Sequence, residues 1–478
     1  MSLKKHTISG VKWTTLSTIM LTLAGILKLS VLARYLSTED FGLMALVTFV
    51  LGFMNLFMDM GLTSAILHKQ NITNKQYSSL YWLNVLFSLL LFASITLFSG
   101  IIANFYNEKE LSILIPLMGL SIIFFALGNQ YKIIEQKELN FKYIALVEIL
   151  SSILGIILAI ILAVKNHGVY ALVYSALLQH GISNFFFFFK GTKQRGILLY
   201  FNIEETKPFL KIGIYQIGGQ IINYFNRDLD VLVIGKFFGT DILGGYSLAK
   251  QLIRRPLQIV GPVLNRVSMS IFPRFQDNNR KLIEYFKKLF TITGILNAMI
   301  YGSMVILAHW LVLLFYGERL LDIVPYVQLF ALVTYLRAMA GNTGILVVTT
   351  GRTDYNFVWN IIITFIIPIA IYLGALVSIE IVILSLGIVQ LLLLIPNWYI
   401  FFHRLIKYPF SSYIKTHIYP LAISLAYIFL FRKFNESNWL ICMLFTLLLL
   451  ISLSSYSYFA VVEVKSIFKK FLRKHDRI

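Results

Sequence analysis

Cysteine is almost missing from this chain, since Cys442 is its single copy in 478 residues. One cysteine can form neither an intramolecular disulfide nor a cysteine-rich metal site. The eight histidines are scattered without the spacing of metal ligands. The phosphate-binding loop pattern G-x-x-x-x-G-K-S/T does not occur either. We therefore expect no metal, no cofactor and no direct use of ATP.

Charged residues are also few, and their low number indicates the class of protein. Charged residues make up 13% of the chain, hydrophobic residues make up 58%, and the mean hydropathy is +0.76. Such a composition is typical of an integral membrane protein. Apolar runs long enough to cross a bilayer predict about fourteen helices, near residues 10–33, 41–67, 78–103, 111–131, 143–164, 168–189, 209–235, 243–272, 284–315, 323–349, 355–377, 379–402, 413–431 and 438–462.

The charge that remains is mostly positive, with 42 Lys and Arg against 22 Asp and Glu. Of these cations, 28 lie on the side shared by both termini and seven in the opposite loops. This asymmetry follows the positive-inside rule, so membrane topology rather than nucleic-acid binding accounts for the basic character. We expect a multi-pass protein of the bacterial cytoplasmic membrane with both termini cytoplasmic. The first apolar run is longer than a usual signal-peptide core, and we expect it to stay uncleaved.

An internal repeat organises the predicted helices. Residues 33–46 (ARYLSTEDFGLMAL) align with residues 235–248 (GKFFGTDILGGYSL) at an offset of 202 residues. Six predicted helices separate the copies, and an even number preserves orientation, so the halves are parallel repeats. The predicted organisation is an N-terminal six-helix lobe (1–190), a cytoplasmic linker (191–208), a C-terminal six-helix lobe (209–404), two further helices (405–462) and a basic cytoplasmic tail (463–478).

A family resemblance rests on three features of the sequence. They are the first repeat segment, the 6+6+2 helix pattern and the stretch NRDLDVLVIGKFFGTDILGGYSLAKQLIRRPLQ. The chain resembles the polysaccharide exporters of the multidrug/oligosaccharidyl-lipid/polysaccharide (MOP) superfamily, the Wzx-type flippases. The resemblance implies an all-α pair of lobes in a V shape around a central cavity. It also implies a flippase that moves undecaprenyl-pyrophosphate-linked oligosaccharide, for O-antigen, capsule, exopolysaccharide or teichuronic-type polymer. Expected partners are the membrane, this substrate, and a polymerase with chain-length machinery.

Polar residues form a stripe on the helix predicted at 209–235. Gln216, Gln220, Asn223, Arg227 and Asp230 follow one another at spacings of four, three, four and three, which places them on one helical face. A polar face cannot lie against hydrocarbon, so it lines a water-filled cavity or packs against neighbouring helices. In the cavity interpretation, the amides of Gln216, Gln220 and Asn223 suit sugar hydroxyls.

Cations concentrate on the next predicted helix, 243–272, which carries no acidic residue. A charge inside the membrane costs about 2.5 to 3.5 kcal/mol on insertion scales, so several of them indicate an aqueous interior and an anionic cargo. The alternative is that the side chains snorkel to the surface or pair with carboxylates. We predict a pyrophosphate site formed by Arg227, Lys250, Arg254, Arg255, Arg266 and Arg337.

Four further charges are candidates for gating or ion coupling. Lys28 and Asp230 occupy positions related by the 202-residue offset, so opposite charges lie at equivalent places in the two lobes. They are either a gate or a static pair. Asp59 and Glu148 are candidates for a proton or sodium cycle, with structural pairing as the alternative.

Two other classes of function compete with a flippase. A cation-coupled multidrug antiporter of the same superfamily is expected to carry an acidic residue in its first helix, where this chain has Lys28. A membrane glycosyltransferase or polymerase needs catalytic residues in a sizeable outer loop, and the predicted outer loops are short. We therefore expect a transporter without covalent chemistry, and no catalytic residue.

Overall fold

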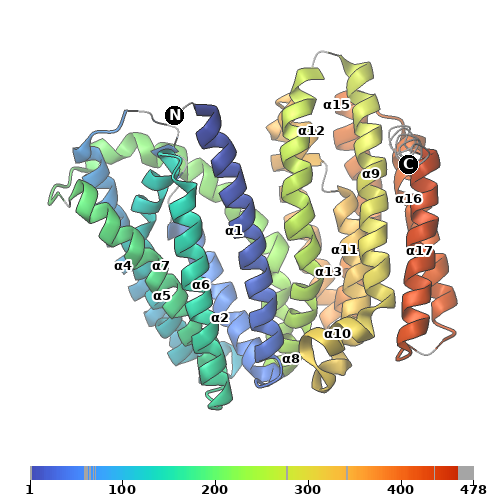
Figure 1. The fold of residues 1–478 in the computed structure, drawn as a ribbon, viewed down its shortest axis with the longest axis horizontal. Coiled ribbons are helices and arrows are strands. Elements are labelled where there is room, and N and C mark those ends of the chain that lie inside the picture. The colour runs from blue at the N-terminus through green and yellow to red at the C-terminus, as the bar shows by residue number, and fades with distance from the viewer. Residues whose placement is uncertain are drawn as a thin grey trace, which may run out of the picture. The chain divides into compact units, whose positions relative to one another are not determined.

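The computed structural model describes residues 3–460, apart from 59–62, 64, 65, 68, 70, 197, 276, 277, 341, 342 and 435. In this part of the chain the regular elements are all helical, with no strand (Figure 1). The helices form two compact units, Met1–Ser247 and Leu248–Ile478, which we call unit 1 and unit 2.

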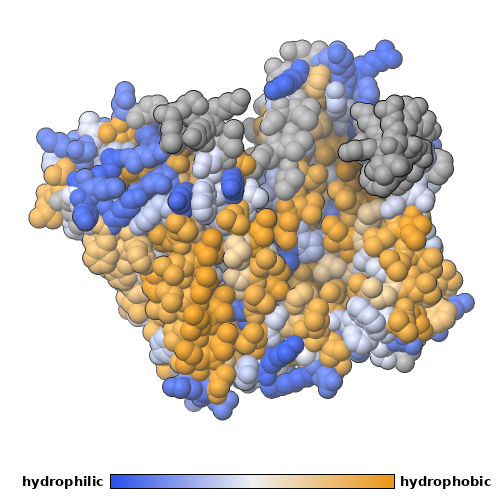
Figure 2. All heavy atoms as spheres, viewed as in Figure 1, coloured by the Kyte–Doolittle hydropathy of each residue, from blue (hydrophilic) through white to orange (hydrophobic). Residues whose placement is uncertain are grey.

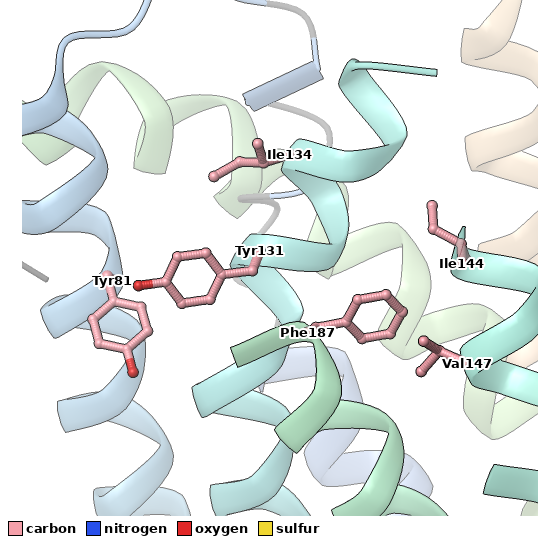
Figure 3. Close-up of a cluster of buried hydrophobic side chains, with 6 residues drawn as sticks. All are labelled: Tyr81, Tyr131, Ile134, Ile144, Val147 and Phe187. Atoms are coloured by element: carbon pink, nitrogen blue, oxygen red, sulfur yellow. The ribbon is translucent and has the colours of Figure 1, made fainter. Parts of the chain in front are cut away.

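Unit 1 is a bundle in which helices distant in sequence pack side by side. Helix α5 contacts α2, α4 and α7, and α6 lies between α7 and α1 (Figure 1). A cluster of aromatic and branched side chains fills the interior near one end of this bundle (Figure 3). Besides the first part of α8, its helices are α1 (Leu3–Leu32), α2 (Thr38–Met58), α4 (Asn74–Tyr106), α5 (Leu111–Lys137), α6 (Phe141–Val164) and α7 (Val169–Arg195).

Local signals in the sequence fix the ends of α4. Thr73 and Gln76 form a capping box, in which each side chain accepts a hydrogen bond from the other residue's backbone N–H. At the other end Asn107 adopts a left-handed conformation with φ of 60°, and its N–H closes the last turn. The helix therefore begins and ends at residues suited to those positions.

Helix α8 (Ile203–Ile271) has 69 residues, far more than one membrane crossing needs. A straight helix of this length would extend about 100 Å, whereas the hydrocarbon core is about 30 Å thick. It bends at Gly239, where φ is 80° and ψ is 176°, a conformation that favours glycine. Two helical parts therefore meet at Gly239, inside the interval 236–242 where the sequence predicts a break, and a single glycine makes the turn in place of a loop.

Unit 2 continues α8 and packs its other helices around α9. Helices α11, α16 and α17 contact α9, and α14 contacts α11 and α13. The predicted helix 284–315 is divided into α9 and α10, and the predicted helix 323–349 covers α11 and α12. The elements are η1 (Phe272–Phe275), α9 (Asn279–Ile306), α10 (Ala308–Tyr316), η2 (Glu318–Ile323), α11 (Val324–Ala340), α12 (Thr343–Thr350), α13 (Thr353–Ala375), α14 (Ile379–Asn397), η3 (Trp398–His403), α15 (Arg404–Ile406), α16 (Phe410–Phe431) and α17 (Trp439–Ala460).

Thirteen segments of the described residues are long and apolar enough to cross a membrane. One of them, Gly218–Pro262, contains the bend of α8 and has 45 residues, enough for two crossings. On the visible face of unit 1, a hydrophobic band covers the middle of the helices and hydrophilic residues gather at their ends (Figure 2). The prediction of an all-α polytopic membrane protein with about fourteen crossings is confirmed.

Candidate functional site

The first part of α8 has one packed face and one polar face. Tyr224 is buried, its hydroxyl donates to the Phe49 carbonyl of α2 at 2.6 Å, and the two rings lie 5.2 Å apart. On the other face the side chains of Gln220, Asn223 and Arg227 are exposed. These polar side chains lie on a segment long and apolar enough to cross a membrane, where exposed polar groups favour water over lipid.

Arg227 is held over the same surface by two neighbours. Its Nε lies 2.6 Å from Asp228 Oδ2, and its guanidinium lies 5.5 Å from the centre of the Tyr224 ring. These contacts orient the side chain while about half of its surface stays accessible. The side chain of Gln216 lies outside the described part of the structure.

Asp230 is the last residue of the polar stripe. Unlike the exposed residues before it, its side chain is buried, with 3% of its surface exposed. The Tyr246 hydroxyl donates a short hydrogen bond to Asp230 Oδ2. These residues lie on opposite sides of the bend at Gly239, so the hydrogen bond connects the two parts of α8 within unit 1. A buried carboxylate needs such donors.

The basic part of α8 belongs to unit 2. Lys250 is 8% exposed, and Arg254 and Arg255 are half-buried. Arg255 donates to Gln258 Oε1 at 3.3 Å. The backbone of this part is fixed by Tyr316 of α10, whose hydroxyl donates to the Leu248 carbonyl at 3.1 Å. Three cations on consecutive turns of one helix form a local field suited to an anion.

The remaining candidate cations lie apart on the chain. Arg337 is exposed near the end of α11 in unit 2. The side chain of Arg266 lies outside the described part of the structure. Among the described residues, no group of three or more His, Cys, Asp or Glu side chains could hold a metal ion.

Within unit 1, Glu148 of α6 has a defined partner. Lys132 of α5 lies 2.7 Å from its carboxylate, and Ser17 of α1 donates to it at 3.2 Å. Lys132 was not among the candidates, because the helix predicted at 111–131 stopped one residue before it. Lys28 is half-buried on α1, and Asp59 lies outside the described residues.

The repeat segments meet each other, which the sequence analysis did not anticipate. A Cβ on Gly42 would fall well under 3.0 Å from the Thr240 carbonyl, and a Cβ on Gly244 would do the same at the Thr38 carbonyl. Since Gly42 aligns with Gly244 and Thr38 with Thr240, the contact is reciprocal, as at a two-fold axis. Thr38 also donates a short hydrogen bond to Asp241. The pairing of glycines at equivalent repeat positions is the signal that could have predicted this crossing.

Carboxylates gather in the loops beside this crossing. Thr240 donates to Glu108 Oε1 at 2.7 Å. Burial raises the pKa of Glu110, and the nearby carboxylates of Asp40, Glu39 and Glu108 raise it further.

The fold and the site together define a polytopic membrane transporter with a polar, basic helix within its membrane spans. The family profile described as polysaccharide biosynthesis protein matches residues 31–325, and the chain belongs to this family. The family resemblance seen in the sequence is confirmed.

Similar proteins support this assignment. The chain is 28% identical over 426 residues to the lipopolysaccharide biosynthesis protein WzxC of Escherichia coli, covering 89% of this chain and 87% of that protein. It is 30% identical over 391 residues to the amylovoran biosynthesis protein AmsL of Erwinia amylovora. This match covers 78% of this chain and 97% of that protein. The structure of the lipid II flippase MurJ in an inward closed conformation matches with a TM-score of 0.71 at 16% identity. The match covers 95% of this chain and 100% of that chain, so the fold is shared.

Proposed function

We propose that this protein is a flippase that moves undecaprenyl-pyrophosphate-linked oligosaccharide units across the cytoplasmic membrane for the synthesis of a cell-surface polysaccharide. The observation that carries the proposal is the exposed polar face of the first part of α8, and the cations that follow the bend at Gly239 add to it. Membership of a polysaccharide biosynthesis family supports it, as does the fold shared with a lipid II flippase.

The two parts of α8 suit the two chemical parts of such a substrate. The amides of Gln216, Gln220 and Asn223 can donate to and accept from sugar hydroxyls. Lys250, Arg254, Arg255 and Arg266 after the bend, together with Arg227 before it and Arg337 of α11, supply positive charge for the pyrophosphate, and arginine binds phosphate through two parallel hydrogen bonds. The polyprenyl tail stays in the bilayer, so the protein carries only the polar head.

Transport requires access to alternate between the two membrane faces. We infer that two lobes, 1–190 and 209–404, rock around a central cationic cavity in a V-shaped arrangement. Lys28 and Asp230 are the proposed gate. Asp59 and Glu148 are the candidates for ion coupling, and the Lys132 pairing of Glu148 supports a structural role for that carboxylate.

The proposed orientation has both termini and the 191–208 linker in the cytoplasm, where lipid-linked units are assembled. A polymerase with its chain-length machinery would take the units on the opposite face. The protein itself makes and breaks no covalent bond in this scheme.

The test is export at matched protein levels in the double variant Arg254→Ala with Arg255→Ala. Each substitution removes a charge-assisted contact worth about 1.5 to 3 kcal/mol, so surface polymer should fall at least tenfold. The matched control is Arg432→Ala with Lys433→Ala, an adjacent exposed basic pair between α16 and α17, which should export normally. Unchanged export by the first variant would remove these arginines from the mechanism.

A further inference from the structure

Four helices of unit 1 each contribute one charged or imidazole side chain to a common cluster. The residues are Lys28 of α1, Lys132 of α5, Glu148 of α6 and His180 of α7. Lys132 and Glu148 form an ion pair, and the positive charges of Lys28 and Lys132 both act on the imidazole of His180. We call these four residues the basic cluster.

The ion pair forms one end of the basic cluster. Glu148 accepts a hydrogen bond from Ser17 at 3.2 Å in addition to its contact with Lys132 at 2.7 Å. Lys132 Nζ also lies 5.9 Å from the centre of the Phe187 ring, which is labelled in Figure 3. The Lys132 side chain nevertheless stays 37% exposed. An ammonium group has three N–H donors, so Lys132 has donors left for a further acceptor.

Lys28 lies at the other end of the basic cluster. It follows Ser17 by eleven residues, which is about 16 Å along α1. It is half-buried, and its ammonium group makes no hydrogen bond or ion pair with any residue that the structure describes. A cation on a membrane-spanning helix is costly unless it pairs with an anion or contacts water. Lys28 is therefore open to an anionic ligand.

His180 is close enough to interact with both lysines. Its side chain is exposed on a segment that is long and apolar enough to cross a membrane, where an exposed polar group favours water over lipid. The charges that act on the imidazole, those of Lys28 and Lys132, are both positive. An imidazole donates at least one N–H hydrogen bond in either protonation state. His180 therefore offers a donor to an anion in a positive field.

The charges of α8 that belong to unit 1 have partners of their own. Arg227 lies 2.6 Å from Asp228, and Asp230 accepts a hydrogen bond from Tyr246. Asp59 lies outside the described residues. The basic cluster itself contains two ammonium groups and one carboxylate, so it has an excess of positive charge even with a neutral imidazole.

From these observations we propose that the basic cluster is a second oxyanion site, which binds the phosphate groups of the cargo in unit 1. The inference rests on the proposed function, because it takes the pyrophosphate of that cargo as the ligand. Lys132, His180 and Lys28 supply the donors. Since the two lysines lie at different levels along the helices, the phosphate groups pass from one to the other, past the imidazole, as the head group crosses the membrane.

The first test measures the local electric field, so its outcome does not depend on the cargo. His180→Cys in a Cys442→Ser background is treated, as full-length protein in detergent, with anionic and cationic methanethiosulfonates of similar size. The ratio of the anionic to the cationic rate should exceed that of a free thiol about tenfold, because positive groups attract one reagent and repel the other. Adding Lys28→Gln should lower this ratio about threefold. Adding Glu148→Gln should raise it.

Two controls separate water from lipid and a local field from a general one. Leu97→Cys, on an exposed apolar face of α4, should react with neither reagent. Lys165→Gln removes an exposed lysine directly after α6 and should leave the ratio unchanged. Inorganic pyrophosphate should slow the anionic labelling of His180→Cys more than sodium chloride of equal ionic strength. The site is disproved if His180→Cys reacts with neither reagent or faster with the cationic one, or if the two salts slow it equally.

The second test is export, and it separates the cargo from other sources of phosphate. His180→Leu leaves both lysines in place and should lower surface polymer about fivefold at matched protein levels. His180→Arg restores donors and charge and should retain more export than His180→Leu. Normal export by His180→Leu would exclude the cargo as the ligand and leave a free phosphate or a lipid headgroup. If loss of the whole protein leaves surface polymer unchanged, the proposed function fails, whereas the labelling still decides whether the cluster binds an oxyanion.

Discussion

The crossing of α2 and α8 allows a sharp test of the structure. Alanine in place of Gly42 or Gly244 adds one methyl group where the opposing atom is a backbone carbonyl oxygen, at well under 3.0 Å. A backbone oxygen cannot rotate away as a side chain can. Either substitution must therefore force the two helices apart and weaken the hydrogen bond between Thr38 and Asp241.

The expected cost follows from overpacking. Inserting a methyl group into a closely packed site costs about 1 to 3 kcal/mol. Both glycines lie at the same crossing, so the separation forced by the first substitution makes room for the second. The double variant should lose clearly less stability than the sum of the two single variants.

The assay is thermal unfolding of the purified protein in detergent, followed by intrinsic fluorescence. Gly100→Ala in α4 is the matched control, because a Cβ there meets no atom within 4 Å. We expect the melting temperature to fall in Gly42→Ala and in Gly244→Ala. We expect no fall in the control. The reasoning would be refuted if Gly42→Ala melted at the same temperature as Gly100→Ala. It would also be refuted if the losses of stability in Gly42→Ala and Gly244→Ala added fully in the double variant.

Three further predictions concern other parts of the molecule. Gln220→Leu with Asn223→Leu should lower polymer export at unchanged protein levels, because it removes amides from the exposed face of α8; normal export would exclude a glycan contact. A cysteine at position 193 in a Cys442→Ser background should resist labelling from outside intact cells, and its labelling would reverse the proposed topology. Burial and the carboxylate of Asp40 hold the pKa of Glu110 above its ordinary value of 4.5 in the folded protein, so ionisation opposes folding and stability is lost as the pH rises through the raised pKa. Glu110→Gln should therefore raise the melting temperature at pH 7, and the gain should vanish below pH 4.5; an equal gain at both pH values would contradict this.

The fold class and the helix count were predictable because membrane insertion acts on local composition. A run of apolar residues identifies its own helix without reference to distant contacts. The same holds for the polar stripe of α8, since helical spacing alone places Gln220, Asn223 and Arg227 on one face. The structure shows that these three side chains are exposed while Tyr224 packs against α2.

Helix boundaries and ion-pair partners were harder to predict from the sequence, because they depend on three-dimensional contacts. The sequence predicted two helices separated at 236–242, and the non-helical backbone of Gly239 does separate two helical parts there, but it does so with one residue rather than a loop. The sequence left open whether Glu148 couples an ion or forms a structural pair, and packing of α5 against α6 brings Lys132 to it.

The sequence by itself determined the membrane class, the parallel repeat and the basic character of α8, since each depends on residue type and spacing along one chain. Tertiary structure alone decided that the repeat segments touch at Gly42 and Gly244. It also decided that Gln130 of α5 lies buried and donates from Nε2 to the Tyr77 carbonyl of α4. Such contacts join residues far apart in sequence, and their geometry is set by how whole helices pack, which no local pattern encodes.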